Sequence, residues 1–307
     1  MKRFSSMTTT QIARICGVSQ GTVDRALHDR PGINPETKER ILAVAREYAY
    51  VPSVGGKQPT GKSMLIGVVL YDLYNEFFSK FAMSLTNVFQ SVGYSVVFLF
   101  SNKELAAERS AVDYFNYIGV DGIVLFSVGS DDAEYLSYLR SVMRPIVAVG
   151  NRMDGLTYIG VDDACAMYDL TVRMPMRDGA LQYFAPILKK ELHSLNAQRL
   201  RFEGFRRAAE ECGRDWQLVT DESDLDDACA GIICSTDHYV LRVFRQLGFS
   251  CEVPLAGFDH VPMLEHFGRT IFTVEYSTDQ IAEACMQYFL KRKFDPHIPH
   301  TVIGGEA

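Results

Sequence analysis

The sequence predicts a small all-α head containing a helix-turn-helix, followed by an α/β body of two doubly wound parallel-sheet subdomains. Three observations lead to this fold class. Residues 9–27 fit a helix-turn-helix position by position, residues 52–63 are rich in Pro, Gly, Ser and Lys, and from residue 64 onward strands alternate with helices. We therefore expect a head over 1–52, a hinge linker over 53–63 and a body over 64–307.

The first helix of the head is expected to follow Thr9, which is placed to cap it. Its apolar face, at helical spacing, consists of Ile12, Ala13, Ile15 and Cys16. Gly17 then supplies a residue able to take the left-handed turn conformation, Val18 is an apolar plug, and Ser19 caps a second helix. This order of small, glycine and apolar positions favours the motif over an ordinary helical hairpin.

The second helix has an inward and an outward side. Its inward residues, expected to pack on the first helix, are Val23, Ala26 and Leu27. The outward residues are Gln20, Thr22 and Arg25, on the side where a recognition helix meets base edges and phosphates. A third helix is predicted over 35–50, with Asn34 as its cap and Pro35 as its first residue. Its buried stripe is expected to be Ile41, Leu42, Ala45 and Tyr48.

The net charge of −7 conceals an uneven distribution along the chain. Residues 1–62 carry 10 Lys and Arg against 5 Asp and Glu, whereas the remainder carries 21 against 33. Only the head therefore has the sign needed to displace counterions from DNA phosphates. We expect the head to bind double-stranded DNA and phosphate to repel the body.

The linker matches the phosphate-loop pattern GxxxxGK[ST] at Gly56, Gly61, Lys62 and Ser63. That motif binds phosphate when a strand precedes the glycine loop and a helix begins at the lysine. Here a helix and a proline precede it and the strand MLIGVVLY follows it, so nucleotide binding is not expected. We expect Lys57 and Lys62 to lie close to DNA instead.

The body alternates strand and helix throughout. Strands are predicted at 64–71, 94–100, 121–127, 145–151, 158–163, 180–187, 230–235, 254–259 and 270–276. Helices are predicted at about 77–92, 104–117, 131–142, after 163, and at 197–212, 237–247 and 278–291. The first subdomain is expected over about 64–160 plus 277–295, and the second over about 161–273 plus 298–307. Two doubly wound units in tandem place a ligand in the crevice at the carboxyl ends of their strands.

Composition argues against several other classes of protein. No apolar run approaches the roughly 18 residues of a membrane span, and the basic N-terminus leads into a helix, not a secretory apolar region, so we expect a cytoplasmic protein without membrane contact. The cysteines have no CxxC pair and are expected to be reduced, five of them in apolar segments: Cys16, Cys165, Cys229, Cys234 and Cys285. His297 and His300 flank Pro299 in a tail, where zinc is not expected. We expect neither a cofactor nor a metal.

Head, linker and paired body together resemble the LacI-type family of bacterial transcriptional repressors, the relatives of the lactose and purine repressors, over essentially the whole chain. The segments that carry the resemblance are TTTQIARICGVSQGTVDRAL with RPGINPETKERI, YVP, LIGVV, NEFF at 75–78, VDGIVL at 120–125, YIGVDD, RFEGF at 201–205 and AGFD at 256–259. The resemblance implies a homodimer with a body similar to a periplasmic sugar-binding protein. It also implies that a small polar, sugar-like effector in the cleft alters the spacing of two heads on a palindromic operator.

Polar and aromatic side chains are expected at the strand ends that border the crevice. The candidate effector contacts are Tyr71, Asp72, Asn75, Phe77, Phe78, Asn102, Ser127, Asn151, Arg152, Arg201, Asp237, Asp259 and Tyr276. Aromatic walls with fixed carboxylates, amides and a guanidinium suit a polyol or a similar hydroxylated ring, because each buried hydroxyl must be hydrogen-bonded. One of the two phenylalanines can equally belong to the core.

Two of these contacts follow from the resemblance, which implies that Arg201 of the RxxG[FY] segment and Asp259 touch the effector. The alternative for Arg201 is a solvated arginine on a helix face, since Arg199, Arg206 and Arg207 surround it. We expect Arg201→Ala to abolish the response to ligand and to leave the folding of the ligand-free protein unchanged.

The chain departs from the family pattern at several positions. Thr236 and Asp237 replace a common Asn-Asp pair, Tyr276 replaces a common Gln, Glu76 replaces the proline of NPFF, and MRDG replaces the usual GHR step. The extra aromatic residue and the lost amide suggest an effector different from lactose-like sugars, with a phosphorylated or non-sugar ligand as alternatives. The alternative function is a solute-binding receptor without regulatory DNA binding. No Ser/His/Asp or Cys/His ordering indicates an enzyme.

On the operator we expect Gln20, Thr22 and Arg25 in the major groove, with Gly21 departing from the larger polar residue common there. The other predicted DNA-binding residues are Thr9, Ser19, Asn34, Thr37, Lys57 and Lys62. Family members fold the segment after the YxP junction into a hinge helix that inserts a leucine into the minor groove. Here Gly55, Gly56 and Pro59 disfavour a helix by roughly 5 kcal/mol in total. We therefore expect an extended hinge, with a proline wedge as the alternative.

Overall fold

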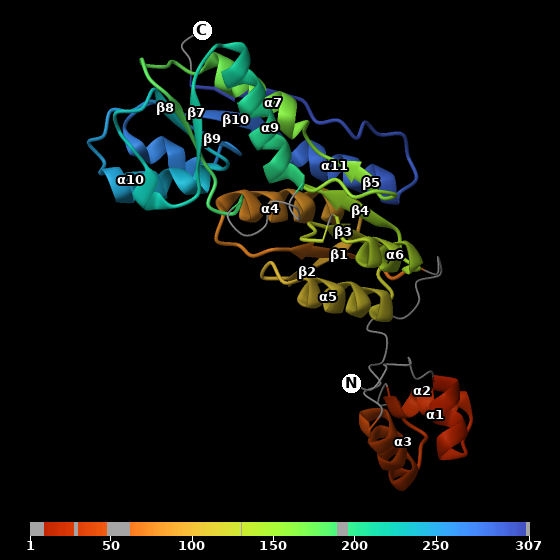
Figure 1. The fold of residues 1–307 in the computed structure, drawn as a ribbon. Coiled ribbons are helices and arrows are strands. Elements are labelled where there is room, and N and C mark those ends of the chain that lie inside the picture. Colours follow the sequence, from red (N-terminus) through yellow and green to blue (C-terminus); the bar gives the residue numbers. More distant parts are fainter. Residues whose placement is uncertain (1–8, 28–29, 48–61, 130, 189–195, 305–307) are drawn as a thin grey trace. The chain divides into compact units, whose positions relative to one another are not determined.

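The computed structural model describes residues 9–27, 30–47, 62–129, 131–188 and 196–304 (Figure 1). The chain divides into two compact units, with the boundary between Ser63 and Met64. Within the described part, no helix has the length and apolar character needed to span a membrane. The predicted extended hinge, including Lys57 and Pro59, lies outside the described residues, whereas Lys62 is described and exposed.

The head consists of three helices around a small apolar core. They are α1 (Thr9–Cys16), α2 (Gln20–Leu27) and α3 (Pro35–Glu47). The buried residues are Ile12, Ala13, Cys16, Val23, Ala26, Ile41 and Ala45. Gly17 has φ 62°, as the turn between the first two helices requires. The Ser19 hydroxyl accepts a hydrogen bond from Thr22 N, and the Asn34 side chain accepts one from Glu36 N, so both predicted caps are confirmed.

Two details of the head differ from the expectation. Thr9 is the first residue of α1 and not its cap, and its hydroxyl accepts a hydrogen bond of 2.9 Å from Gln20 Nε2. Ile15 is 51% exposed, because the side of α1 packed against α2 and α3 is filled by Ile12, Ala13 and Cys16. The predicted end of the third helix, with Tyr48, lies outside the described residues.

The first subdomain of the body is built on a parallel sheet in the order β2-β1-β3-β4-β5. Its strands are β1 (Leu65–Leu70), β2 (Ser95–Phe100), β3 (Gly122–Leu125), β4 (Ile146–Val149) and β5 (Thr157–Ile159). Its helices are α4 (Glu76–Ser91), α5 (Leu105–Ile118), α6 (Ala133–Ser141) and α11 (Thr278–Phe289), with α4 and α5 on opposite faces of the sheet (Figure 1). The sheet is covered on both faces, which explains the continuous apolar runs of its central strands.

The second subdomain is built on a sheet in the order β11-β10-β9-β8-β6-β7. Its strands are β6 (Leu181–Phe184), β7 (Trp216–Val219), β8 (Gly231–Cys234), β9 (Leu255–Phe258), β10 (Phe272–Tyr276) and β11 (His300–Ile303). Its helices are α7 (Asp163–Arg173), α9 (Asn196–Glu211) and α10 (Val240–Leu247), with 3-10 turns η1 (Glu222–Asp224), η2 (Asp237–Tyr239) and η3 (Pro262–Phe267). The strand β11 runs antiparallel to β10, and the sequence predicted neither β7 nor β11.

The chain crosses between the two subdomains of the body three times. It passes from β5 to α7, returns from β10 to α11, and passes back before β11. Two crossings are hydrogen-bonded together, because Gly160 N donates to Pro296 O and Gly160 O accepts from Ile298 N, each at 3.1 Å. The two sheets are therefore joined at their strand ends, where the crevice was expected.

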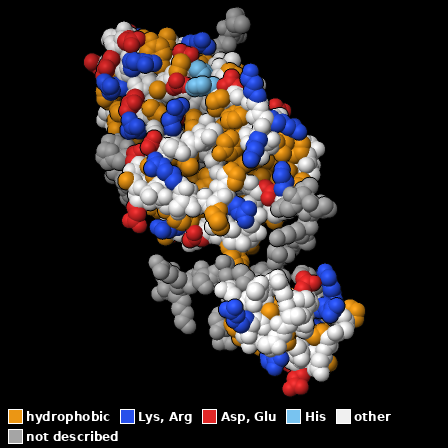
Figure 2. Space-filling model, turned by 90° about the vertical axis from the view of Figure 1, so that its right-hand side faces the viewer, with side chains coloured by type: hydrophobic (Ala, Val, Ile, Leu, Met, Phe, Trp, Pro, Cys, Tyr) orange, Lys and Arg blue, Asp and Glu red, His pale blue; other side chains and the backbone are white. Residues whose placement is uncertain are grey.

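The surface of the body carries single exposed apolar residues among charged ones. Figure 2 shows hydrophobic side chains in orange, interspersed with blue and red charged groups, on the face of the body turned to the viewer. The most exposed large apolar side chains in the described part include Tyr74, Met143, Phe249 and Met83. Scattered exposure of this kind is ordinary for a folded domain.

Candidate functional site

A cavity of about 410 Å³ lies in the body at the strand ends where the two sheets meet. The predicted residues that line it are Tyr71, Asp72, Asn75, Phe77, Phe78, Asn151, Arg201, Asp259 and Tyr276. The sequence did not predict Tyr158, Asp163, Lys103, Gln198, Thr236 or His238, which also line it. The volume falls in the range of small-molecule sites.

The wall from the first subdomain is mainly aromatic. Tyr71 and Phe78 meet edge to face at 5.5 Å between centroids, and Phe77 meets Phe78 at 5.4 Å. The ring centroid of Phe77 also lies 5.7 Å from that of Tyr276, the last residue of β10 in the second sheet. The two phenylalanines are held by α4, which Asn75 caps by accepting a hydrogen bond from Phe77 N. Both are largely buried and both line the cavity, so each serves core and cavity wall together.

The wall from the second subdomain is charged, and Arg201 is its centre. This residue lies on α9 and is only 7% exposed, so the alternative of a solvated arginine is wrong. Its Nε donates to Asp163 Oδ1 at 2.7 Å, its Nη1 donates to Ser235 O at 2.9 Å, and its Nη2 lies 3.5 Å from Asp259 Oδ1. The guanidinium also stacks on the ring of Phe258, 3.6 Å from the centroid. The buried guanidinium of Arg201 thus contacts two carboxylates, Asp163 at the start of α7 and Asp259 directly after β9.

Burial dominates the protonation of these carboxylates. Loss of solvent raises the pKa of Asp163 to about 6, although the charge of Arg201 opposes the shift. Burial likewise raises the pKa of Asp259, against the opposing effects of Arg201 and of hydrogen bonds from Tyr276 and Asn75. The nearby carboxylates raise the pKa of Arg201 despite its burial, so the guanidinium stays charged. The cluster is therefore a closely coupled buried network of one cation and two acids.

The backbone at the end of β9 is held in an unusual conformation. Asp259 has φ 109° and His260 has φ 45°, in a region that residues with a side chain rarely adopt. Such conformations cost about 1–3 kcal/mol each and persist where the surroundings fix them. Here the Tyr276 hydroxyl donates to Asp259 Oδ1 at 2.9 Å, and the Asp259 amide donates to Val274 O. The strained backbone of Asp259 thus coincides with a side chain that is held in place by hydrogen bonds and lines the cavity.

Asn151 connects the two subdomains through its side-chain amide. Its Nδ2 donates to the Tyr71 hydroxyl at 2.6 Å and to Ser127 O at 2.8 Å, both in the first subdomain. Its Oδ1 accepts from Ala197 N, at the start of α9 in the second subdomain. A movement of one subdomain against the other would therefore break or form hydrogen bonds at this one residue.

Four predicted contact residues do not line the cavity. Asn102 is exposed in a left-handed turn after β2, where the next residue, Lys103, lines the cavity instead. The buried Ser127 hydroxyl donates to Glu108, so only its carbonyl takes part in the network around Asn151. Arg152 is exposed and lies over the ring of Tyr158. Asp237 is fully buried, and it accepts hydrogen bonds from Val261 N and the Thr273 hydroxyl.

In the head, the outward residues of α2 are accessible. Gln20 and Arg25 are exposed and Thr22 is half-buried, bonded through its hydroxyl to Ser19 at 2.8 Å. At the start of α3, Asn34 is exposed and Thr37 is half-buried. Figure 2 shows Lys and Arg side chains in blue on the head as well as on the body.

Three residues of the body lie in surroundings that we did not predict. The pattern YIGVDD predicts Asp163 at the end of a strand, but it is the first residue of α7. Glu108 is fully buried in α5, where its carboxylate accepts from Ser127 Oγ and Val128 N. Its helical spacing from Ala111, Val112 and Phe115 places it on their buried face, and this spacing is the signal that could have identified it. Cys165 was expected in an apolar segment but is exposed on α7.

The comparisons with known proteins agree with this architecture. Residues 8–53 match the model of bacterial regulatory proteins of the lacI family, and residues 63–232 match that of periplasmic binding proteins and the sugar-binding domain of the LacI family. Among relatives, the HTH-type transcriptional regulator RegA of Clostridium saccharobutylicum is 25% identical, with 91% of this chain and 90% of that protein covered. The ribose operon repressor of Bacillus subtilis is 25% identical over 83% of this chain and 82% of its own length.

A solved structure of the lac repressor dimer, bound to operator and the anti-inducer ONPF, shares the fold. Its TM-score is 0.64 at 16% identity, with 97% of this chain and 98% of that chain covered. The two family models together span the head and more than half of the chain, in the order in which the structure arranges a helix-turn-helix and a two-subdomain body. The chain is a member of the LacI family of bacterial regulatory proteins.

Proposed function

We propose that this protein is an effector-responsive transcriptional repressor that binds a palindromic operator as a homodimer. The observation that carries the proposal is the buried cluster of Arg201, Asp163 and Asp259 facing a cavity of about 410 Å³, in the same chain as a helix-turn-helix head. The head supplies a DNA-reading surface and the body supplies a ligand site. A chain with both can couple the two by binding ligand more tightly in one arrangement than in the other.

The charge of the cavity supports an uncharged, polyhydroxylated effector. The single charge of Arg201 is faced by two carboxylates, so little positive potential is left for an anionic ligand. Lys103 lines the cavity but is exposed, where water screens its charge. Carboxylates accept hydrogen bonds from hydroxyl groups, and the rings of Phe77 and Phe78 offer an apolar face to a sugar ring. A neutral sugar therefore fits better than the phosphorylated alternative.

Asn151 supports a mechanism of closure around the effector. Its amide already contacts both subdomains, so a ligand that alters their angle changes this set of hydrogen bonds. A coupling free energy of about 1–3 kcal/mol, or roughly 5- to 150-fold in affinity, is typical between two such sites. We place the body's subdomains at about 64–160 plus 277–295 and about 161–273 plus 298–307.

On DNA, we assign Gln20, Thr22 and Arg25 to the major groove. The remaining assigned contacts are Thr9, Ser19, Asn34, Thr37, Lys57 and Lys62, toward phosphates and the minor groove. Because Gln20 Nε2 is bonded to the Thr9 hydroxyl, a base contact by Gln20 must replace or share that hydrogen bond. Regulation of transcription requires access to the chromosome, so we place the protein in the cytoplasm.

The test is binding of the full-length protein to the DNA upstream of its own gene, with and without a panel of effectors. The panel contains neutral pentoses and hexoses, and their phosphorylated and amino derivatives at equal ionic strength. We expect a neutral sugar to change DNA affinity at least fivefold. An Arg25→Ala variant should bind DNA more weakly and keep its sugar affinity, which separates the head from the cleft.

Two outcomes would contradict the proposal. Sugar binding without any specific DNA binding would indicate a solute receptor. A response confined to phosphorylated compounds would contradict the assignment of a neutral effector, and it would leave the role of the head intact.

A further inference from the structure

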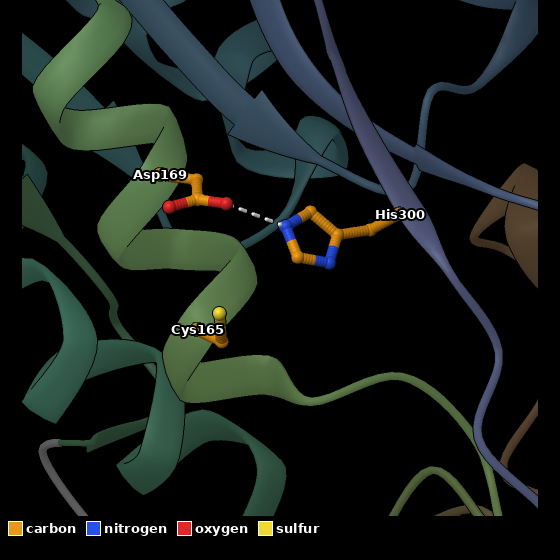
Figure 3. Close-up of side chains that lie close together, drawn as sticks. All are labelled: Cys165, Asp169 and His300. Atoms are coloured by element: carbon orange, nitrogen blue, oxygen red, sulfur yellow. Dashed lines mark hydrogen bonds and ion pairs between the residues drawn. The ribbon is translucent and has the colours of Figure 1, made fainter.

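Three side chains with metal-binding chemistry meet on the surface of the second subdomain, away from the cavity. Cys165 and Asp169 lie four residues apart on α7, so they occupy the same face of the helix. His300 is the first residue of β11, at the edge of the sheet, and α7 packs against this strand. Figure 3 shows the imidazole facing both residues across the gap between helix and strand.

The geometry of the three donor atoms is close to that of a tetrahedral site. One donor atom from each residue lies within 4.8 Å of the other two, and His300 Nε2 is 3.0 Å from Asp169 Oδ2. Ligands at zinc bond lengths and tetrahedral angles are about 3.3–3.6 Å apart. The thiol therefore needs to approach by at most about 1.5 Å. Cys165 is exposed, so neighbouring side chains leave room for this change of rotamer.

We propose that Cys165, Asp169 and His300 bind a divalent cation of the zinc class. The combination of sulfur, imidazole nitrogen and carboxylate oxygen selects against calcium and magnesium, which prefer oxygen ligands throughout. Three protein ligands leave a fourth position for water or another donor. The side chains of Asp169 and His300 are 34% and 16% exposed, so an ion can reach the site from solvent.

The site joins segments far apart in the sequence. Asp169 and His300 are separated by 131 residues, which is why the spacing of cysteines and histidines along the chain did not predict zinc here. A bound ion would tie α7 to the antiparallel edge strand, and α7 begins with Asp163, which holds Arg201 in the cavity. The metal site uses no residue that lines the cavity, so its test is independent of the effector's identity.

The experiment is a zinc titration of the full-length, reduced and metal-stripped protein in competition with a chromophoric chelator. We expect one zinc ion per chain, and after cobalt substitution a thiolate-to-cobalt absorption band with the intense visible bands of a tetrahedral site. Cys165→Ala and His300→Gln should each weaken zinc binding at least tenfold. The matched control is Cys212→Ala, because Cys212 is also exposed and follows α9 on the same subdomain; it should leave zinc affinity unchanged.

The same variants distinguish the metal site from a simple ion pair between Asp169 and His300. Zinc should raise the melting temperature of the wild type and of Cys212→Ala, but not that of Cys165→Ala. Equal zinc affinity in the wild type and Cys165→Ala, or an equal loss in Cys212→Ala, would overturn the proposal.

Discussion

At Gly204 the helices α7 and α9 cross so closely that there is no room for a side chain. A Cβ atom added at residue 204 would lie 2.2 Å from Ala164 O and 3.0 Å from Ala164 C. Ordinary contacts of a Cβ atom are 3.4–4 Å, so one helix must move by about 1 Å. The obstacle is backbone and not the end of a flexible side chain, so no rotamer change can relieve it.

Gly204→Ala is therefore expected to destabilise the body, although alanine favours a helix. The gain in helix propensity is about 1 kcal/mol, and overpacking costs about 1–3 kcal/mol, with a clash against backbone in the upper part of that range at about 2–3 kcal/mol. Gly21 in α2 provides the matched control, because a Cβ atom there would meet its nearest neighbour, Ser19 Oγ, at 3.8 Å. A net loss of about 1–2 kcal/mol corresponds to a fall of roughly 2–8 °C in the melting temperature of a domain of this size.

The displacement should also reach the cavity, because Arg201 and Asp163 line it. Arg201 lies one helical turn before Gly204, and Asp163 directly precedes Ala164, so separating the helices lengthens the 2.7 Å hydrogen bond between them. The assay is scanning calorimetry of the body's transition, followed by sugar binding to the folded variant. A melting temperature for Gly204→Ala equal to or above that of the wild type would refute the argument from helix contact.

Substitutions in the buried cluster, at Asp237, in the head and in the linker test four other parts of the reasoning. Arg201→Ala should lower the free energy of unfolding by about 3–5 kcal/mol, because it leaves two buried carboxylates without their cation. The control is Arg206→Ala at an exposed ion pair, which should change the free energy of unfolding by less than about 1 kcal/mol. Equal urea midpoints for the two variants would contradict this reasoning. Burial raises the pKa of Asp237 to about 8 in the folded protein, whereas an unfolded aspartate has a pKa near 4. The folded protein therefore holds this proton more tightly, and the resulting stabilisation is complete below about pH 4 and is lost as pH rises through about 8. Asp237→Asn should flatten that decline, which is at most about 1.4 kcal/mol per pH unit, and an unchanged profile would argue against a protonated Asp237. Arg25→Ala should weaken operator binding by about 1–3 kcal/mol per half-site, and unchanged affinity at physiological salt would show that the assigned helix register is wrong. Lys57→Ala should reduce affinity without changing the DNA bend, and a sharply kinked central step in the wild-type complex would contradict the extended hinge.

The elements of the fold were largely predictable where their sequence pattern is local. Apolar runs such as 65-LIGVVL-70 are strands buried on both faces, and Ser19 and Asn34 cap helices by contacts within three residues. The short strands β7 and β11 were missed because they lie at the two edges of their sheet. A four-residue edge strand such as His300–Ile303 has exposed positions and no continuous apolar run.

The site was only partly predictable, because its key contacts join distant segments. Family resemblance pointed to Arg201 and Asp259, and both line the cavity. The burial of Arg201 was not predictable, and it leads us to expect a loss of stability in Arg201→Ala in place of unchanged folding. Asp163 and Asp237 show why the sequence alone does not identify the residues that line the cavity. Both are acids at element boundaries, and only the packing of the second subdomain decides that one faces the cavity and the other is enclosed.

The three crossings between the subdomains limit how the body can deform. Two lobes joined by one linker can slide, twist and separate, whereas lobes attached at three points can turn mainly about the line through those points. The hydrogen bonds of Gly160 to Pro296 and Ile298 fix two of those points to each other. An effector that draws the lobes together would thus drive a nearly one-dimensional rotation. The direction of the displacement would then be set by the fold, while the ligand's differential affinity for the two arrangements would set only how far the equilibrium shifts.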